Sequence, residues 1–271
     1  YTTGSLTDVA AAIDRAIEHG QNAMAITDAR TLAGVPDFVR RAKAAGIKPI
    51  IGMEVSLAAS GDRMHVHRLT ADAPLFHNVT LLAANTQGWS NLVAINNASI
   101  ESTCSRPVVD IHLLAKHAAG LILLTGGLDG PLAELISRGL SQEAERNFAE
   151  LSDAFGEGNV CVEVTCQGLI AEGPVAAELQ RLAARSGAPV VATNPFSYVH
   201  EELAVHHAAM AEADRPRSKE PRPAPERDDL PALHLRSEVE MLSANPRSSF
   251  WQEAVEMTAG IACLLYTSDA A

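Results

Sequence analysis

The sequence lacks features that several classes of protein require. No apolar run approaches the roughly 20 residues of a membrane-spanning helix, and we expect no signal peptide ahead of the first helix. The four cysteines form no CxxC pair, which favours reduced thiols in a cytoplasmic protein over a disulfide framework. No GxSxG turn is present, so no serine-nucleophile triad can be assembled.

Basic residues are also in short supply. The chain has 21 lysines and arginines against 33 aspartates and glutamates, which gives a formal net charge of −12. Tight binding to duplex DNA needs clustered basic side chains that neutralise phosphates. We therefore do not expect this chain by itself to hold DNA.

Short apolar runs alternate with amphipathic segments along the first 200 residues. The runs predict strands at 23–26, 47–55, 79–83, 121–124, 160–164 and 190–193. The amphipathic segments predict helices at 6–17, 35–42, 89–100, 132–136, 144–155 and 175–183. Nearly continuous apolar strands separated by helices are typical of a parallel sheet covered by helices. At 271 residues a barrel is favoured over an open doubly wound sheet.

The regular pattern weakens after residue 200. Residues 214–231 carry five prolines and many charges, which predicts an irregular solvated segment. Helical character returns at 237–242 and 250–262. Residues 263–271 resemble translated sequencing adapter, and we interpret them as a non-native tail. The predicted organisation is a barrel core at 1–200, the end of the same domain at 201–262, and that tail.

Several short motifs occur in an order that is typical of one family. They are AITDA at 25–29, GIKPIIGMEV at 46–55, GGLDG at 126–130, VEV at 162–164 and VATNP at 191–195. Together they resemble the PHP (polymerase and histidinol phosphatase) domain of bacterial DNA polymerase III α subunits, in the proteobacterial form. The resemblance implies a distorted TIM-like (β/α)7 barrel of the PHP type. It also implies that a first strand carrying His-x-His would precede Tyr1.

In metal-active members of that family, histidines, carboxylates and sometimes a cysteine at the ends of the strands hold a metal cluster. Hard carboxylates and imidazoles suit zinc or manganese, which activate a bound water. The matching positions in this chain are mostly occupied by residues that cannot bind metal. They are Asp28, Ala29, Glu54, Gly127, Gln167, Pro195 and Ser197.

Among these positions Glu54 alone survives as a possible ligand, and one carboxylate cannot hold a metal cluster. We therefore predict a degenerate site with no catalytic residue, no stoichiometric zinc or manganese and no phosphoester hydrolysis. The barrel geometry should persist without the metal. We predict a cleft at the strand ends lined by Asp28, Glu54, Gly127, Gln167, Asn194 and Ser197.

Other residues allow a functional and a structural interpretation. The pairs His65–His67 and His206–His207 could mimic metal ligands, but exposed surface histidines are the more common case. The glycines at 126–130 could cradle a phosphate or form a tight turn from strand to helix. Asp28 could keep a polar role at the barrel mouth, although capping the following helix is the more ordinary role.

The resemblance implies a DNA-directed DNA polymerase as the parent chain, with Mg²⁺ held by aspartates in a palm domain beyond residue 271. This fragment would need no cofactor and would act as a scaffold. The partners would be the proofreading exonuclease and other subunits of the polymerase III holoenzyme, with residues 214–231 as a candidate docking segment. Primer-template DNA would be bound through the parent chain, and no membrane would be involved. The alternatives are a stand-alone metal-dependent phosphoesterase and the α-like subunit of an error-prone polymerase.

Overall fold

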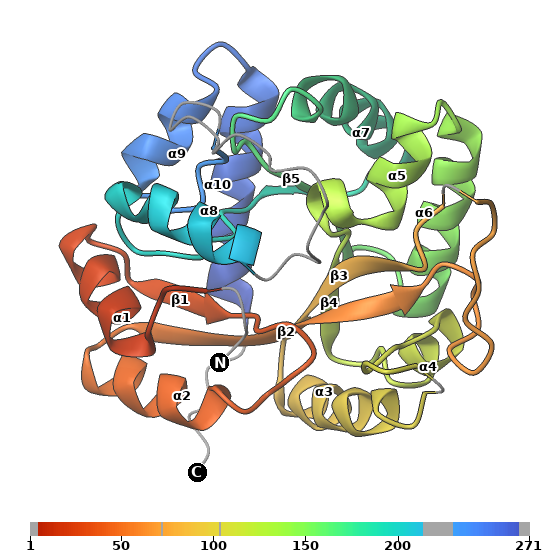
Figure 1. Cartoon of the computed structure of the whole chain (residues 1–271), viewed down its shortest axis with the longest axis horizontal. Helices are drawn as coiled ribbons and strands as arrows, with labels where there is room; N and C mark the ends of the chain where they lie inside the picture. The colour runs from red at the N-terminus through yellow and green to blue at the C-terminus, as the bar shows by residue number, and fades with distance from the viewer. Residues whose placement is uncertain (1–4, 72, 103, 214–229, 266–271) are drawn as a thin grey trace.

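Six strands form one curled sheet with helices packed around it (Figure 1). The computed structural model describes residues 5–71, 73–102, 104–213 and 230–265. The strands follow one another in sheet order, and all six lie within one or two residues of the predicted runs or extend them. They are β1 (Ala23–Ile26), β2 (Lys48–Ala58), β3 (Phe76–Ala83), β4 (Leu121–Leu124), β5 (Val160–Val164) and β6 (Val190–Ala192). The predicted distorted α/β barrel is confirmed, as a half-barrel with six strands among the described residues.

Seven of the ten α-helices in the described part of the chain begin with a capping side chain or with a proline in the first two helical positions. Asp8, Asn85, Asp110, Ser237 and Ser248 each accept a backbone N–H of the first turn that follows, a contact that contributes about 1 kcal/mol. The α-helices are α1 (Val9–Glu18), α2 (Val35–Ala44), α3 (Thr86–Ser99), α4 (Ile111–Lys116), α5 (Pro131–Ser137), α6 (Ser141–Phe155), α7 (Glu172–Ser186), α8 (Ala204–Ala213), α9 (Glu238–Ala244) and α10 (Ser249–Leu264). The described residues also form two short 3₁₀ turns, η1 (Gly127–Asp129) and η2 (Glu201–Leu203).

One of these helices, α4, was not predicted from the sequence, whereas the polar helix expected to carry His206 and His207 is α8. α4 has only six residues, which is too short to show a helical period. α8 buries only Ala204, so its apolar residues form no stripe. No helix in the described part of the chain is long and apolar enough to cross a membrane.

The prediction of an all-parallel sheet is wrong for β3. This strand runs antiparallel to both β2 and β4, with Glu54 opposite Thr80 and Thr80 opposite Leu124. The described chain between β2 and β3 contains no helix, so it turns back beside β2 instead of crossing over the sheet. As a result, the start of β3 lies at the end of the sheet where the parallel strands finish.

The curled sheet buries side chains on both faces. The main core lies between the strands and the surrounding helices. A smaller cluster takes one residue from each of five strands, namely Ile50, Leu82, Leu124, Cys161 and Val191, together with Leu265. The side chain of Leu265 is only 4% exposed, although this residue belongs to the segment predicted to be a tail. The non-native origin of that segment stays a prediction, and residues 266–271 lie outside the described residues, as do residues 214–229 of the proline-rich segment.

The end of α10 is fixed to the sheet by a lysine. Lys48 Nζ donates hydrogen bonds to the carbonyl oxygens of Ala262 and Cys263, both at 2.9 Å. A cation at a helix C-terminus satisfies carbonyls that have no partner within the helix and complements the helix dipole. Residues 263 and 264 complete this helix.

Candidate functional site

Three of the predicted positions meet just after the end of β1, beside the middle of β2. Ala29 pairs with Glu54 in an isolated parallel bridge. The backbone N–H of Glu54 donates to the carbonyl oxygen of Asp28 at 3.3 Å, and that of Arg30 donates to the carbonyl oxygen of Glu54 at 2.8 Å. The chain therefore continues beside β2 after β1 ends, which places Asp28, Ala29 and Glu54 next to one another.

A second group of contacts joins the ends of β4, β5 and β6 through Glu163. Its side chain is 8% exposed, and its Oε2 accepts the backbone N–H of Gly126 at 2.8 Å. Its Oε1 accepts the hydroxyl of Thr193 at 2.6 Å. Its backbone N–H donates to the Thr125 hydroxyl at 2.9 Å. Both carboxylate oxygens are thus directed at protein groups, and burial raises the pKa of the carboxyl.

Charged side chains gather around Glu54. Burial raises the pKa of its carboxyl, Arg30 opposes that shift, and the carboxylates of Asp129 and Glu163 reinforce it. Arg106 also lowers the pKa of Glu54, and the guanidinium of Arg106 has its own pKa lowered by burial and by Arg30. Two guanidinium groups and three carboxyl groups therefore interact electrostatically at the C-terminal ends of the strands, which we call the mouth of the half-barrel.

Arg106 is placed at this mouth by the reversed strand. Its guanidinium carbon lies 3.9 Å above the centre of the Phe76 ring, at the start of β3. A guanidinium stacked on an aromatic face in this way gains a cation–π attraction of ~1 kcal/mol. Had β3 been parallel to its neighbours, Phe76 would lie at the opposite end of the sheet.

The glycines after β4 form a tight turn. A Cβ atom on Gly126 would lie 1.8 Å from the carbonyl oxygen of Asn78, and its φ is +87°. Gly127 has a φ of +52°, and a Cβ atom there would lie 3.1 Å from Thr165 Cγ2. Since the N–H of Gly126 is already donated to Glu163, these contacts favour the structural interpretation of this turn over a phosphate cradle.

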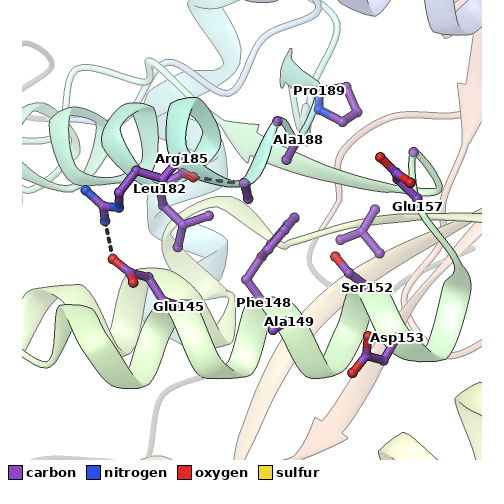
Figure 2. Close-up of a pocket in the computed structure, with 14 residues that line it drawn as sticks. Glu145, Phe148, Ala149, Ser152, Asp153, Glu157, Leu182, Arg185, Ala188 and Pro189 are labelled. Carbon is purple, nitrogen blue, oxygen red and sulfur yellow. Dashed lines mark hydrogen bonds and ion pairs between the residues drawn. The ribbon is translucent and has the colours of Figure 1, made fainter.

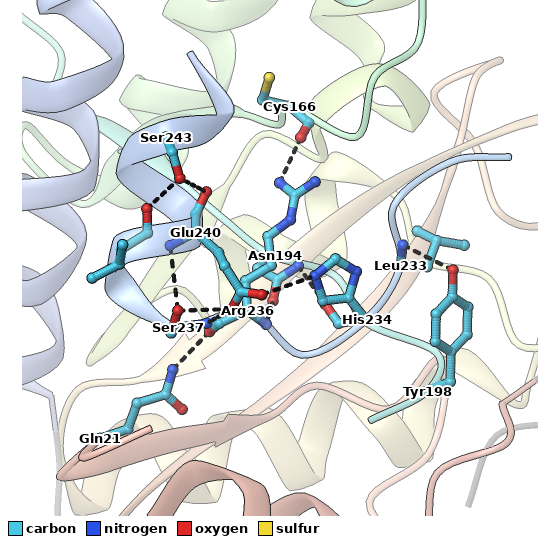
Figure 3. A network of polar contacts seen from close by, with 11 residues as sticks. Gln21, Cys166, Asn194, Tyr198, Leu233, His234, Arg236, Ser237, Glu240 and Ser243 are labelled. Atoms are coloured by element: carbon cyan, nitrogen blue, oxygen red, sulfur yellow. Dashed lines mark hydrogen bonds and ion pairs between the residues drawn. The ribbon is translucent and has the colours of Figure 1, made fainter. Parts of the chain in front are cut away.

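The positions after β5 and β6 are covered by residues 231–236, which we call the strap. The N–H of Ala232 donates to the carbonyl oxygen of Gln167 at 2.9 Å. The N–H of Ser197 donates to the carbonyl oxygen of Leu233 at 2.8 Å. The hydroxyl of Tyr198, which is 1% exposed, accepts the N–H of Leu233 at 3.2 Å (Figure 3). The backbone at Gln167 and Ser197 is therefore bonded to the strap.

Arg236, at the end of the strap, joins three separate parts of the chain (Figure 3). Its guanidinium donates to the carbonyl oxygen of Cys166 at 2.6 Å, just after β5. Its N–H donates to Asn194 Oδ1 at 2.9 Å, just after β6. Its carbonyl oxygen accepts the side-chain amide of Gln21 at 2.9 Å, just before β1. The strap thus links the two edges of the open sheet.

The seven predicted site residues therefore lie in three places. Asp28, Ala29 and Glu54 lie together, while Gln167 and Ser197 lie under the strap with Pro195 exposed near them. Gly127 lines a small pocket with Glu163, Thr165 and Glu172, and none of the other five residues of the predicted cleft lines that pocket. The cleft lined by all six residues stays a prediction.

The residues present do not fit a metal cluster. Ala29, Gly127 and Pro195 offer no ligand atom in their side chains, and the oxygens of Glu163 are bonded to Gly126 and Thr193. Within the described ranges, no group of three or more histidine, cysteine, aspartate or glutamate side chains could hold a metal ion. A cation beside Glu54 would in addition meet the charge of Arg30.

The other candidate residues have ordinary surroundings. His65 Nδ1 lies 2.9 Å from Asp62 Oδ2 with the side chain 82% exposed. The ring of His207 lies 5.4 Å from that of Tyr198, between centroids. The prediction that Asp28 caps the following helix is wrong, because the N-cap of α2 is Gly34 and no side chain caps that helix.

Sequence reasoning missed Glu163, Arg30 and Arg106 as members of the site. Glu163 had a visible signal, since it is the single charged residue in the strand Val160–Val164. A charge in a strand that is buried throughout needs a partner. For Arg30 no signal existed, because its φ of +61° and its position beside Glu54 depend on the folded chain.

Comparison with known proteins gives consistent results. Residues 1–167 match the PHP domain family. DNA polymerase III subunit alpha from Treponema pallidum is 37% identical over 210 residues, which cover 76% of this chain and 18% of that protein. The subunits of the same name from Thermus aquaticus and Vibrio cholerae are 32% and 31% identical, over 89% and 82% of this chain. The chain spans about a fifth of the length of these relatives. Among solved structures, an amidohydrolase from Chromobacterium violaceum gives a TM-score of 0.44 at 16% identity, over 72% of this chain and 85% of that one.

Proposed function

The chain belongs to the PHP domain family and, within it, to the DNA polymerase III α subunits, and we propose that it serves its parent chain as a scaffold without hydrolytic activity of its own. The parent chain would extend a primer with deoxynucleotides in the cytoplasm, using Mg²⁺ bound outside residues 1–271. The fragment itself would need no metal or other cofactor.

The observation that carries this proposal is the set of partners of Glu163. This carboxylate lies at the end of β5, where a metal-dependent member of the family would need open ligand atoms, yet it accepts hydrogen bonds from Gly126 and Thr193. Catalytic metal sites keep a position open for water or substrate. A carboxylate whose two oxygens both bind protein donors instead joins three strands, which is a structural role.

The charges at the mouth support the same proposal. Arg30 and Arg106 both act electrostatically on Glu54, so positive charge is already supplied there by the protein. A metal ion would have to displace these guanidinium groups or bind against their repulsion. The arrangement therefore stabilises a folded mouth without metal.

Metal content and hydrolysis test the proposal directly. The purified chain, dialysed against zinc and then manganese, should retain less than one metal ion per chain and should not hydrolyse p-nitrophenyl phosphate above buffer with either metal. Glu54→Ala should change neither result. Two or more bound metals, lost together with hydrolysis in Glu54→Ala, would overturn the scaffold proposal and favour the stand-alone phosphoesterase.

A scaffold must have a partner, and we propose that the partners are the proofreading exonuclease and other holoenzyme subunits. The net charge of −12 favours protein over DNA as the contact, because an acidic surface repels phosphates. Immobilised chain should retain the exonuclease of the same organism, and it should not bind primer-template at ~150 mM salt, where electrostatic binding is weak. Retention of DNA without the exonuclease would contradict this assignment.

A further inference from the structure

A groove opens at the opposite end of the strands from the candidate site. It lies between α6 and α7, beside Val160 at the start of β5 and Pro189 just before β6 (Figure 2). Its volume is about 430 Å³, which lies within the range of about 300–1,000 Å³ that is usual for ligand sites. We call it the α6–α7 groove, and no step of the proposed function uses it.

The floor of the α6–α7 groove is apolar. Figure 2 shows Phe148 pointing from α6 and Leu182 from α7 into the space between the two helices. Both side chains also pack in the main core, and they are 6% and 3% exposed. Their positions are therefore fixed before any ligand arrives, and a partner would not have to order them.

The rim of the groove is acidic. Glu145, Asp153 and Glu157 line it, and the one cationic lining residue, Arg185, is ion-paired with Glu145. For Asp153 and Glu157 no ion pair occurs within the described part of the chain. A ligand that approached this rim would therefore meet two carboxylates whose charge is not compensated locally.

Two helix ends add to this negative field. The last turn of α6 carries Ser152 and Asp153 and contains no basic residue. α7 ends at Ser186 with Gly187 as its C-cap, both in the groove wall, and its last turn carries Arg185. A helix C-terminus has the effect of about half a negative charge. Arg185 already complements this charge at the end of α7, whereas the end of α6 favours an additional cation.

We propose that the α6–α7 groove binds a segment of a partner protein in which an arginine or lysine lies beside an apolar side chain. The apolar side chain contacts Phe148 and Leu182, and the cation lies between Asp153 and Glu157. Charge complementarity selects this occupant, since acidic segments and nucleic acid are repelled by the rim. The proposal rests on the scaffold function, because it names the kind of partner that this domain would hold.

A peptide titration tests the proposal. The probe is a capped Gly-Leu-Arg-Leu-Gly peptide added to isotope-labelled chain 1–271, with backbone and methyl resonances followed by NMR. Shifts should concentrate at Phe148, Leu182 and Glu157. The double variant Asp153→Asn/Glu157→Gln should weaken binding at least about fivefold, as should raising NaCl from ~50 to ~500 mM.

Matched controls distinguish binding in the groove from binding elsewhere on the chain. Glu150→Gln removes an exposed carboxylate of α6 that does not line the groove, and it should leave the affinity unchanged. A peptide with glutamate in place of arginine should not bind. Arginine amide alone should shift few resonances. If it shifted the same resonances as far as the peptide does, the groove would be a site for small cations and the proposal would be overturned.

Failure of the groove proposal and failure of the scaffold proposal give different results. If the arginine peptide shifts no resonance, or shifts resonances equally in the double variant and in the unsubstituted chain 1–271, the groove proposal is wrong. The metal and hydrolysis measurements remain independent of that outcome, because the groove lies away from Glu54 and Glu163.

Discussion

Thr193 donates its hydroxyl to Oε1 of Glu163 at 2.6 Å, which joins the end of β6 to the end of β5 inside the half-barrel. The second oxygen of the same carboxylate accepts Gly126, just after β4. One buried acid thus holds three strand ends in register. In a sheet whose first and last strands do not pair, such contacts help to fix the curvature that the open edges leave undetermined.

The pH dependence of stability should report this buried acid. Burial raises the pKa of Glu163 in the folded chain above its value of 4.5 in the unfolded chain. The folded state then binds more protons, so this contribution to stability is fully present below pH 4.5 and is lost as pH rises through the folded pKa. In Glu163→Gln the side-chain amide can accept the N–H of Gly126 and donate to the hydroxyl of Thr193. Because the amide does not titrate, the variant should lose less stability than the unsubstituted chain as pH rises.

Urea unfolding measured from about pH 5 to about pH 8 checks this prediction. Glu54, whose pKa is also raised, contributes a loss of the same sign in both proteins. Only the difference between the two profiles therefore reports Glu163. Parallel profiles would show that the Glu163 carboxyl titrates alike in the folded and unfolded chains.

Replacing Gly126 should be costly for a steric reason. In Gly126→Ala the new Cβ would lie 1.8 Å from the Asn78 carbonyl oxygen, at a φ of +87°. We expect a loss of about 3 kcal/mol or more in the free energy of unfolding. Gly139→Ala is the matched control, because Gly139 has a φ of +76° with no atom within 4 Å, and it should cost only ~1 kcal/mol. Chemical denaturation measures both losses in unfolding free energy. Equal losses in Gly126→Ala and Gly139→Ala would mean that the positive φ alone sets the cost, without a contribution from the clash with Asn78.

Arg236 should stabilise the strap. In Arg236→Met the aliphatic part of the side chain is kept, but the carbonyl oxygen of Cys166 loses a donor at 2.6 Å. A buried acceptor left without its partner costs about 1–3 kcal/mol. Hydrogen exchange should quicken at Ala232 and Leu235, whose N–H groups bond to Gln167 and Tyr198. Arg247→Met, at an exposed position, is the control and should change the unfolding free energy by less than ~0.5 kcal/mol. If Arg247→Met cost as much as Arg236→Met, the specific role of Arg236 would be refuted.

Glu172 should hold the loop after β5. Its carboxylate, on a residue that is 7% exposed, accepts the N–H groups of Gln167, Gly168 and Leu169 at 2.8–3.0 Å. The hydroxyl of Thr165 also donates to it, at 2.8 Å. Glu172→Gln replaces one acceptor oxygen by a donor and should cost about 2 kcal/mol, with faster hydrogen exchange at 167–169.

Glu178→Gln is the control for this change. It removes a carboxylate of the same helix that is 30% exposed and pairs with Arg181, and exposed pairs contribute little. Unchanged exchange at 167–169 in Glu172→Gln would show that other contacts hold this loop.

The sequence by itself determined where the strands lie and which side chains the candidate site lacks. Apolar runs of four to nine residues between amphipathic segments are buried as elements of the core, so the positions of β1 to β6 could be predicted from the order of apolar and polar residues. The motif around Asp28 and Ala29 likewise identified the family, and with it the absence of a histidine from this position.

Only the tertiary structure decided the direction of β3 and the partners of the polar residues. A strand such as Phe76–Ala83, whose second half has successive buried residues, can pair in either direction, so its sequence does not specify parallel or antiparallel pairing. Thr193 lies 30 residues from Glu163, and Arg236 lies 70 residues from Cys166. Contacts at such separations follow from how the sheet curls and where the chain returns, because local sequence fixes backbone conformation and burial but not which distant groups meet.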